Sequence, residues 1–253
     1  MGLAALLFPL RCVRCGADAA ELPLCPPCAA ELPHLESACP RCAEPLPRTG
    51  VCGRCLAEPP PFVRVLAPFL LAAPVADWIL GLKEGGQLHL GALLGGLLAR
   101  HVDRCGTAVD ALVPVPLHWR RRLRRGFNQS LEIARSAGRH LDVPVRPRWL
   151  ARVRPGPDQR RLPLAQRAAS VHRAFRASDR VAGLRIALVD DVVTTTATAR
   201  AATAALLAAG AAAVEVWAVA RTALENGPSA GNNGLFARRA PWPNPVSPTS
   251  GKS

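Results

Sequence analysis

Long uninterrupted apolar segments are missing from this chain. The longest apolar stretch covers residues 65–82, and Pro68, Pro74 and Asp77 break the continuous helix that a bilayer would require. The apolar opening at residues 3–10 also lacks the preceding basic residues and the following small-residue cleavage site of a secretory signal peptide. We therefore expect a protein that does not span a membrane and that works in the reducing cytoplasm.

Histidine pairs at metal-ligand spacing are also missing, whereas paired cysteines are abundant. The six histidines include no His-x-x-x-His pair, but four Cys-x-x-Cys pairs stand close together near the start of the chain. The second two pairs repeat the first two at an offset of 27 residues. The eight cysteines are Cys12, Cys15, Cys25, Cys28, Cys39, Cys42, Cys52 and Cys55.

Paired cysteines of this kind are typical of zinc ribbons, in which each pair closes a tight knuckle and two knuckles hold one tetrahedral ion. We expect two structural zinc ions, one for each copy of the repeat. The spacing alone does not exclude interleaved knuckles, and the repeat favours pairing within successive copies. A disulfide scaffold would also need an even number of cysteines, but it would require an oxidising compartment.

Lysine is scarce, with Lys83 and Lys252 the only two among 32 basic residues. The formal net charge is +14; eight zinc-bound thiolates would subtract eight charges and two ions would return four, which leaves +10. A GC-rich genome produces the same arginine bias without selection for function. The basic field nevertheless favours polyanionic partners such as phosphorylated ligands or nucleic acid.

Composition divides the chain into four parts. A proline-rich linker at residues 58–62 follows the cysteine module of residues 1–57. Gly, Pro, Ser and Asn dominate residues 226–253, so we expect a disordered tail there. Residues 63–225 remain as a domain of ordinary size.

Short apolar strands alternate with helical patterns in this domain. The expected strands are 63–70, 111–115, 185–189 and 214–220, and the expected helices are 75–82, 88–102, 128–141, 164–175 and 197–209. This alternation predicts an α/β fold with a parallel sheet that helices cover on both faces.

The third strand runs into the most informative segment of the domain. It is followed by two acids and a threonine-rich loop before an alanine-rich helix: Asp190, Asp191, Thr194, Thr195, Thr196, Ala197 and Thr198. Ligands of open α/β sheets bind beyond the carboxyl ends of the strands, and the N-H groups that open a helix suit a phosphate. The pattern predicts a site for a ribose 5-phosphate, although helix capping alone also uses Asp and Thr.

Leu188-Val189-Asp190-Asp191-Val192-Val193-Thr194-Thr195 resembles the phosphoribosyl pyrophosphate (PRPP) signature of type I phosphoribosyltransferases. The wider pattern resembles the ComF family of competence-associated proteins, in which a cysteine-paired zinc module precedes a phosphoribosyltransferase-like domain. The resemblance continues through Leu82-Lys83, Val113 to Leu117, Arg125 to Gln129, Gln159, Leu162, Arg167 and Ala220-Arg221.

The resemblance implies a role for each matching segment. Asp190 and Asp191 would hold the ribose hydroxyls, also during catalysis if the domain is active, and residues 194–198 would bind the 5-phosphate. Val115 and Pro116 would lie in the loop that receives pyrophosphate, and Arg125 and Gly126 in the loop that closes over the ligand. Magnesium would arrive with PRPP, held chiefly by the ligand's own oxygens.

Two residues depart from the family pattern. Thr196 stands where the family has glycine, and a β-branched residue at positive φ is strained by about 1 to 2 kcal/mol. We therefore expect either a reshaped loop or weakened binding. Ser170 stands where the family commonly has asparagine.

An arginine cluster between two aromatic residues is the second candidate site. Its residues are Arg120, Arg121, Arg122, Arg124, Arg125 and Phe127. Such a segment could neutralise phosphates and stack the bases of single-stranded DNA. It also coincides with the ligand-closing loop, and a solvated basic loop would have the same composition.

Two functions follow from the resemblance. The first is a competence-type protein that assists DNA uptake with DNA-uptake proteins as partners, and that binds single-stranded DNA and PRPP, the latter as a ligand and not as a substrate. The second is an active phosphoribosyltransferase, a glycosyltransferase in which acids and pyrophosphate-binding groups stabilise the charge that develops on the ribose. No general base is evident in the sequence, which favours binding over catalysis.

Overall fold

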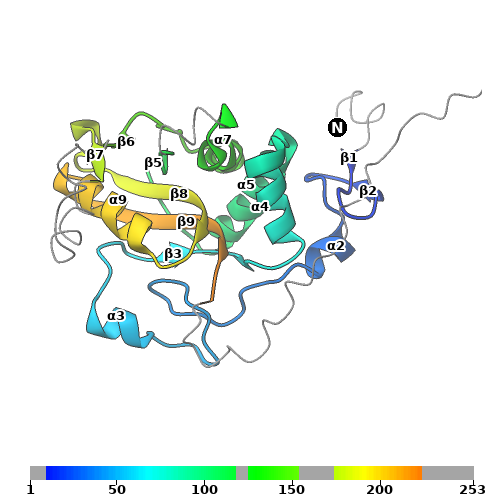
Figure 1. Ribbon diagram of the computed structural model, residues 1–253, viewed down its shortest axis with the longest axis horizontal. Coiled ribbons are helices and arrows are strands. Elements are labelled where there is room, and N and C mark those ends of the chain that lie inside the picture. Colours follow the sequence, from blue (N-terminus) through cyan, green and yellow to red (C-terminus); the bar gives the residue numbers. More distant parts are fainter. Residues whose placement is uncertain (1–9, 118–124, 154–173, 224–253) are drawn as a thin grey trace, which may run out of the picture.

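The computed structural model describes residues 10–117, 125–153 and 174–223 of the chain. Its centre is a five-stranded sheet in which every pairing is parallel, with the order β3-β9-β8-β5 and with β4 also pairing with β9 (Figure 1). The strands are β3 (Val65–Leu66), β4 (Phe69–Leu70), β5 (Ala111–Pro114), β8 (Arg185–Val193) and β9 (Ala213–Arg221).

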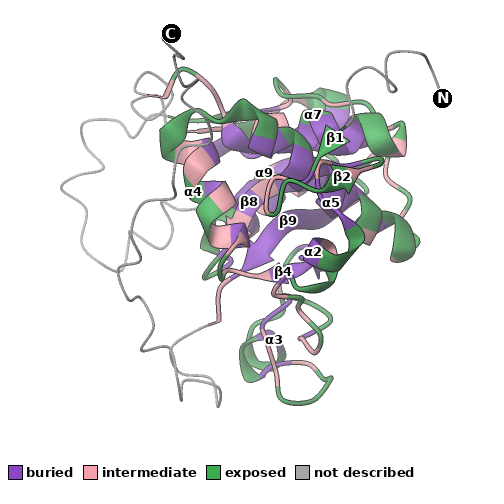
Figure 2. Cartoon of the chain, turned by 90° about the vertical axis from the view of Figure 1, so that its right-hand side faces the viewer, coloured by how far each residue is buried: buried purple, intermediate pink, exposed green. Residues whose placement is uncertain are grey.

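Helices cover both faces of this sheet, as the sequence predicts. They are α4 (Val75–Gly85), α5 (Leu88–Arg104) and α7 (Gln129–Leu141) on one face and α9 (Ala197–Ala208) on the other. In the first part of β8, alternate side chains lie on the two faces of the sheet. Ala187 and Val189 pack with α5 and α7, whereas Ile186 and Leu188 pack with α9. Figure 2 shows that buried residues fill β8 and β9, which explains why these strands are apolar on both sides.

Three strands and four helices lie where the sequence places them, with shifted ends, and two expectations need correction. The expected strand 63–70 is split into β3 and β4, because Pro68 between them has no N-H group for the ladder. Phe175, the expected end of a helix, belongs to β7 (Phe175–Ala177), which pairs antiparallel with β6 (Leu150–Arg152). The rest of that expected helix lies outside the described residues. A short 3-10 helix, Asp179–Val181, then leads into β8.

The strand that carries the two acids is longer than predicted. Its apolar run ends at Val189, but pairing with β9 continues through Asp190 and Val192 to Val193. Asp190 and Asp191 are therefore strand residues, and strand geometry turns neighbouring side chains to opposite faces.

The cysteine-rich segment contains β1 (Leu10–Arg11), β2 (Asp18–Ala19), α2 (Pro26–Ala30) and α3 (Gly53–Ala57). It is packed against the sheet domain, because Leu22, Leu24 and Leu32 belong to the same buried cluster as the leucines of α5. Figures 1 and 2 show α2 beside α5, and Figure 1 shows α3 below β3.

The proline-rich run is attached to the sheet domain, although the sequence suggests a spacer there. Arg200 of α9 donates to the Glu58 carboxylate over 3.0 Å, and Phe62 is only 3% exposed. None of the helices in the described ranges combines the length and apolarity needed to cross a bilayer.

Candidate functional site

The chain turns from the carboxyl end of β8 into α9 (Figure 1). The residues of this turn line a pocket. Its wall includes Val115, Asp190, Thr194, Thr196, Ala197 and Thr198. The structure thus brings together one of the two predicted acids, three of the four predicted threonines and the predicted pyrophosphate-loop residue Val115. Asp191 and Thr195 are not part of this wall.

Asp190 is held in an unusual electrostatic state. Its Oδ1 accepts hydrogen bonds from Ser130 Oγ at the start of α7 and from the Asp191 backbone N-H, each over 2.9 Å. Burial, followed by the charge of Asp191, raises the pKa of Asp190 to about 8. The carboxyl group is therefore mostly protonated in the ligand-free protein at neutral pH.

Asp191 is the next residue of β8 and is 5% exposed. Its carboxylate forms an ion pair with Lys83 of α4. Lys83 belongs to the segments that resemble the family, but the resemblance assigns it no role. The sequence signal that could have identified Lys83 is the rarity of lysine, since it is one of two lysines in an arginine-rich chain. Ser130, the partner of Asp190, has no comparable local signal.

Thr196 has the left-handed conformation that the family glycine would favour, with φ 65° and ψ −2°. The loop therefore keeps the backbone path expected for glycine, with a buried threonine in its place. Thr196 is the N-cap residue of α9, and no side chain caps the helix there. Within the described residues, the first-turn N-H groups of α9 thus have no side-chain acceptor, which suits an anion.

The residues assigned to the closing loop lie near Lys83. Arg125 and Phe127 line a second pocket together with Lys83, Glu84 and Gly86. The buried Nε of Arg125 has no hydrogen-bond partner within the described ranges.

Gly126 in the same loop has a positive φ of 76°, and the loop then leads into α7. Asn128 begins α7, accepting from the Ser130 N-H over 3.0 Å and donating to the Val115 carbonyl over 3.0 Å. Pro116 follows Val115 at the end of β5. The described residues do not include residues 120–122 and 124 of the arginine cluster. They also do not include Ser170, which differs from the family pattern.

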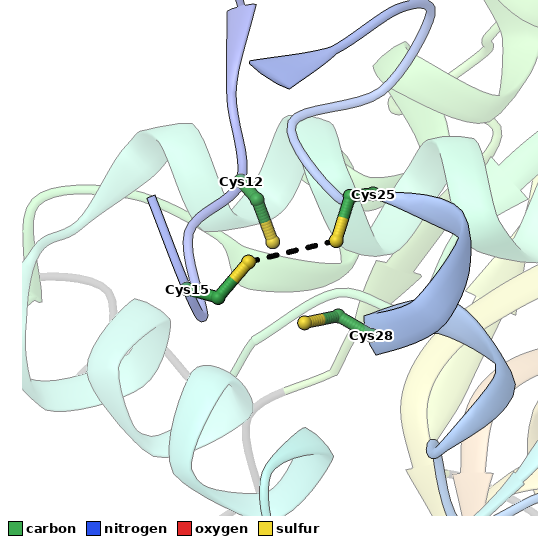
Figure 3. Close-up of side chains that lie close together, drawn as sticks. All are labelled: Cys12, Cys15, Cys25 and Cys28. Carbon is green, nitrogen blue, oxygen red and sulfur yellow. Dashed lines mark hydrogen bonds between the residues drawn. The ribbon is translucent and has the colours of Figure 1, made fainter. Parts of the chain in front are cut away.

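The eight paired cysteines form two clusters, each made from one copy of the repeat. Figure 3 shows the first cluster, with Cys12, Cys15, Cys25 and Cys28. Within each cluster all four sulfur atoms lie within 4.8 Å of one another. Cys15 and Cys25 are 3.6 Å apart between sulfurs, as are Cys42 and Cys52. A tetrahedron with zinc–sulfur bonds of about 2.3 Å has edges of about 3.8 Å, so both clusters fit a zinc ion.

The pairing within successive copies is confirmed, and none of the nine cysteines forms a disulfide. Burial acts to raise the pKa of the Cys39 thiol, but the backbone N-H groups of Cys52, Cys42 and Arg41 outweigh it and lower the pKa to about 7. A thiol with this pKa is ready to bind metal as a thiolate near neutral pH.

The second cysteine cluster is connected to the pocket by Arg221, the last residue of β9. Arg221 donates to the carbonyl oxygens of Cys42 over 3.1 Å and of Val193 over 3.0 Å. The sequence places Arg221 in the closing segment of the resemblance but does not indicate this contact.

Residues 3–56 match a family model described as a double zinc ribbon domain. The chain is 36% identical to the DNA utilization protein YhgH of Escherichia coli K12 over 176 residues. The aligned segment covers 68% of this chain and 78% of that protein. The chain is also 28% identical to competence protein F of Haemophilus influenzae over 224 residues, a segment that covers 85% of this chain and 98% of that protein.

Solved structures are similar to parts of the chain. Glutamine PRPP amidotransferase from B. subtilis, complexed with ADP and GMP, matches at 24% identity and a TM-score of 0.38, over 50% of this chain and 25% of that one. The protein TT1426 from Thermus thermophilus matches at 17% identity and a TM-score of 0.34, over 56% of this chain and 86% of that one. We assign the fold from the observed sheet topology and not from these partial similarities.

Proposed function

The chain belongs to the ComF family of competence-associated proteins, and from that membership we propose that it assists DNA uptake during transformation and binds PRPP as a ligand. The proposed site is the pocket between β8 and α9. In this proposal the protein works in the cytoplasm with proteins of DNA uptake as partners. Its eight paired thiols, which bind metal when reduced, support a reducing compartment.

One observation carries the PRPP proposal: Asp190 lies across one pocket from the uncapped start of α9. A ribose 5-phosphate needs hydrogen-bond acceptors for its hydroxyls and donors for its phosphate, and this turn offers both. Asp190 would accept from the ribose hydroxyls, and the N-H groups of residues 195–198 would bind the phosphate. Asp191 would act through Lys83, which it holds beside Arg125.

Arg125 supports ligand closure more directly than DNA contact. Its buried Nε is unpaired within the described part of the chain, and it shares a pocket with Lys83. Two cations in one pocket suit the pyrophosphate group of PRPP. Single-strand binding by residues 120–127 stays a proposal that a gel-shift assay with labelled single strands would test.

Magnesium fits this proposal as an ion that arrives with the ligand. The only groups of three or more possible metal ligands in the described ranges are the two cysteine clusters. The pyrophosphate and ribose oxygens would therefore supply most of the magnesium ligands, with water completing the shell. Magnesium would neutralise part of the pyrophosphate charge when bound.

The raised pKa of Asp190 favours a second candidate function, an active phosphoribosyltransferase. With a pKa of about 8, a minority of Asp190 carboxyl groups is ionised near neutral pH, and this ionised form could accept a proton from an acceptor molecule. Pyrophosphate release from PRPP with a panel of nucleobases and amines would test this function. Release with any acceptor, abolished by Asp190→Asn, would establish catalysis.

The binding proposal is tested with Asp190→Asn and a matched control. Asp110→Asn makes the same change at the other end of β8, where the Asp110 side chain accepts from the Arg185 N-H over 2.7 Å. Calorimetry at about pH 8.5 should show PRPP affinity reduced about tenfold or more in Asp190→Asn, the effect of one lost charge-assisted bond, and nearly unchanged in Asp110→Asn.

The cellular role is tested with the same two variants. A deletion strain complemented with Asp190→Asn should transform poorly, and one complemented with Asp110→Asn should transform normally. Normal transformation by the uncomplemented deletion strain would contradict the competence role.

A further inference from the structure

Arg221 is a fully buried arginine that joins two parts of the chain far apart in sequence, and its exposed fraction is 0%. Toward the turn, its Nη1 donates to the carbonyl oxygens of Val193, over 3.0 Å, and of Thr194. Toward the cysteine-rich segment, its Nε donates to the Cys42 carbonyl over 3.1 Å and its Nη2 to the Glu44 carboxylate. One planar guanidinium therefore contacts both the pocket turn and the second cysteine cluster.

The two acceptors in the cysteine-rich segment, the Cys42 carbonyl and the Glu44 carboxylate, are held in place by the second cysteine cluster. Cys42 is one of its four cysteines, and the Glu44 carbonyl accepts from the Cys39 N-H over 2.8 Å. The Glu44 carboxylate also lies 3.6 Å from Arg54 of α3, the helix that carries Cys55. Zinc binding by these cysteines would therefore fix the Cys42 carbonyl and the Glu44 side chain in place.

The acceptors on the pocket side determine how the turn presents its N-H groups. The Thr194 carbonyl and the Thr195 N-H belong to one planar trans peptide, in which they point in opposite directions. A Thr194 carbonyl held toward Arg221 therefore directs the Thr195 N-H to the other side of the turn. Binding of a phosphate by such groups is strongest when they are oriented in advance.

The first cysteine cluster has a different environment. Cys12, Cys25 and Cys28 belong to the buried cluster that contains the leucines of α5. Figure 1 shows α2, which carries Cys28, beside α5 and on the other side of the molecule from α3. The two metal sites thus offer a matched comparison within one chain.

We propose that Arg221 is a positioning residue for the β8–α9 turn, and that it orders the turn only when the second zinc site is formed. A buried guanidinium is stable only while its acceptors are in place. Loss of the second zinc site would therefore also disorder the β8–α9 turn. The consequence for PRPP affinity rests on the proposed function, whereas the order of the turn does not. Zinc at the second site then controls binding at the pocket.

The coupling is tested without ligand by hydrogen exchange of the amides of residues 195–197. Cys28→Ser and Cys55→Ser change equivalent positions of the repeat, and both side chains are buried. Each variant should lose one zinc ion, but only Cys55→Ser should speed exchange in the turn, by about tenfold or more. Equal effects of the two variants, or unchanged exchange in Cys55→Ser, would overturn the proposal.

Arg221→Lys tests the same link with both zinc sites intact. Lysine keeps the charge but lacks the planar fork, so this variant should keep two zinc ions, speed exchange in the turn and weaken PRPP binding about tenfold. Val219→Ala, a buried change on the same strand, is the control for general loss of stability and should leave affinity unchanged. An Arg221→Lys chain with native exchange and affinity would refute the role.

Native protein that fails to bind PRPP, while Cys55→Ser still speeds exchange in the turn, would support the coupling and reject the proposed function. The two ideas can therefore fail separately.

Discussion

Two neighbouring carboxyl groups on one strand have different charges in this protein. Asp191 forms an ion pair with Lys83, whereas Asp190 has no cation among its contacts within the described residues and lies half-buried beside the Asp191 carboxylate. Different partners produce this difference, because Asp191 pairs with a lysine, whereas Asp190 contacts a serine hydroxyl and a backbone N-H. The result is one carboxylate that holds a cation and one carboxyl group that titrates near neutral pH.

PRPP affinity should depend on pH through Asp190. The pKa of Asp190 in the ligand-free protein is raised to about 8, and ribose hydroxyls donate to the ionised form. Below this pKa, binding must release a proton, so affinity rises with pH and levels off above about 8. Between pH 7 and pH 9 the dissociation constant should fall about tenfold.

The measurement is calorimetry at several pH values, with Asp190→Asn as the control. The variant has no titrating group at this position, so its affinity should change much less over the same range. An equal pH dependence in both proteins would assign the titration to another group.

Thr196 should store strain in its backbone, because it is a β-branched residue at φ 65°. Thr196→Gly removes that strain, whereas Thr196→Ala removes the branch but keeps Cβ. We expect the glycine variant to have a free energy of unfolding about 1 kcal/mol higher than the alanine variant. Urea denaturation measures the difference, and an alanine variant of equal or greater stability would contradict it.

At the scale of elements, the close packing of α5 on α7 positions the Ser130 end of the site. A Cβ atom at Gly95 would clash with the Ile133 carbonyl oxygen and would lie 2.5 Å from Ser136 Cβ. The two helices can therefore approach closely only because residue 95 has no side chain. A shift of α7 would also alter the hydrogen bond from Ser130 to Asp190.

Gly95→Ala should lower the free energy of unfolding by about 1 to 3 kcal/mol, as overpacking does elsewhere. Gly53→Ala in α3 is the control, because an added Cβ there meets nothing within 4 Å. Denaturant unfolding of the two variants measures both effects. A Gly95→Ala chain as stable as the control would show that α7 can move without cost.

The sequence predicts elements well where a pattern is local. Cysteine spacing identifies both metal clusters, and the apolar run before Asp190 identifies the central strand. The apolar pattern does not reveal the end of that strand, because its last residues include two acids that still lie within the pairing with β9. It does not reveal the antiparallel pairing of β6 with β7 either, because each strand is only three residues long.

Contacts over long sequence distances are not predictable from one sequence. The pairs Asp191–Lys83, Asp190–Ser130 and Arg221–Cys42 each join segments that only the fold brings together. No local spacing carries this information, because strand order and helix packing determine which side chains meet.

At the scale of the whole molecule, the zinc segment and the sheet domain share one core. Leu22 and Leu24 belong to the same buried cluster as Leu93 and Leu98 of α5. The division at residues 58–62 therefore stays a prediction about sequence, and we propose that both parts unfold together. Zinc binding then contributes to the stability of the entire chain.

The purified chain should contain two zinc ions, and a strong chelator should lower its melting temperature as a single transition. Calorimetric melting with and without chelator, together with metal analysis, measures both quantities. One zinc ion per chain would mean that the two clusters are not equivalent. Two separate transitions would show that the zinc segment folds independently of the sheet domain.

The position of the sugar phosphate is tested most directly by a crystal structure of the zinc-loaded chain with PRPP and magnesium. We expect the 5-phosphate on the backbone N-H groups of residues 195–198 and the ribose hydroxyls on Asp190. A structure with PRPP bound elsewhere, or with the turn closed by the protein's own side chains at saturating ligand, would contradict this assignment.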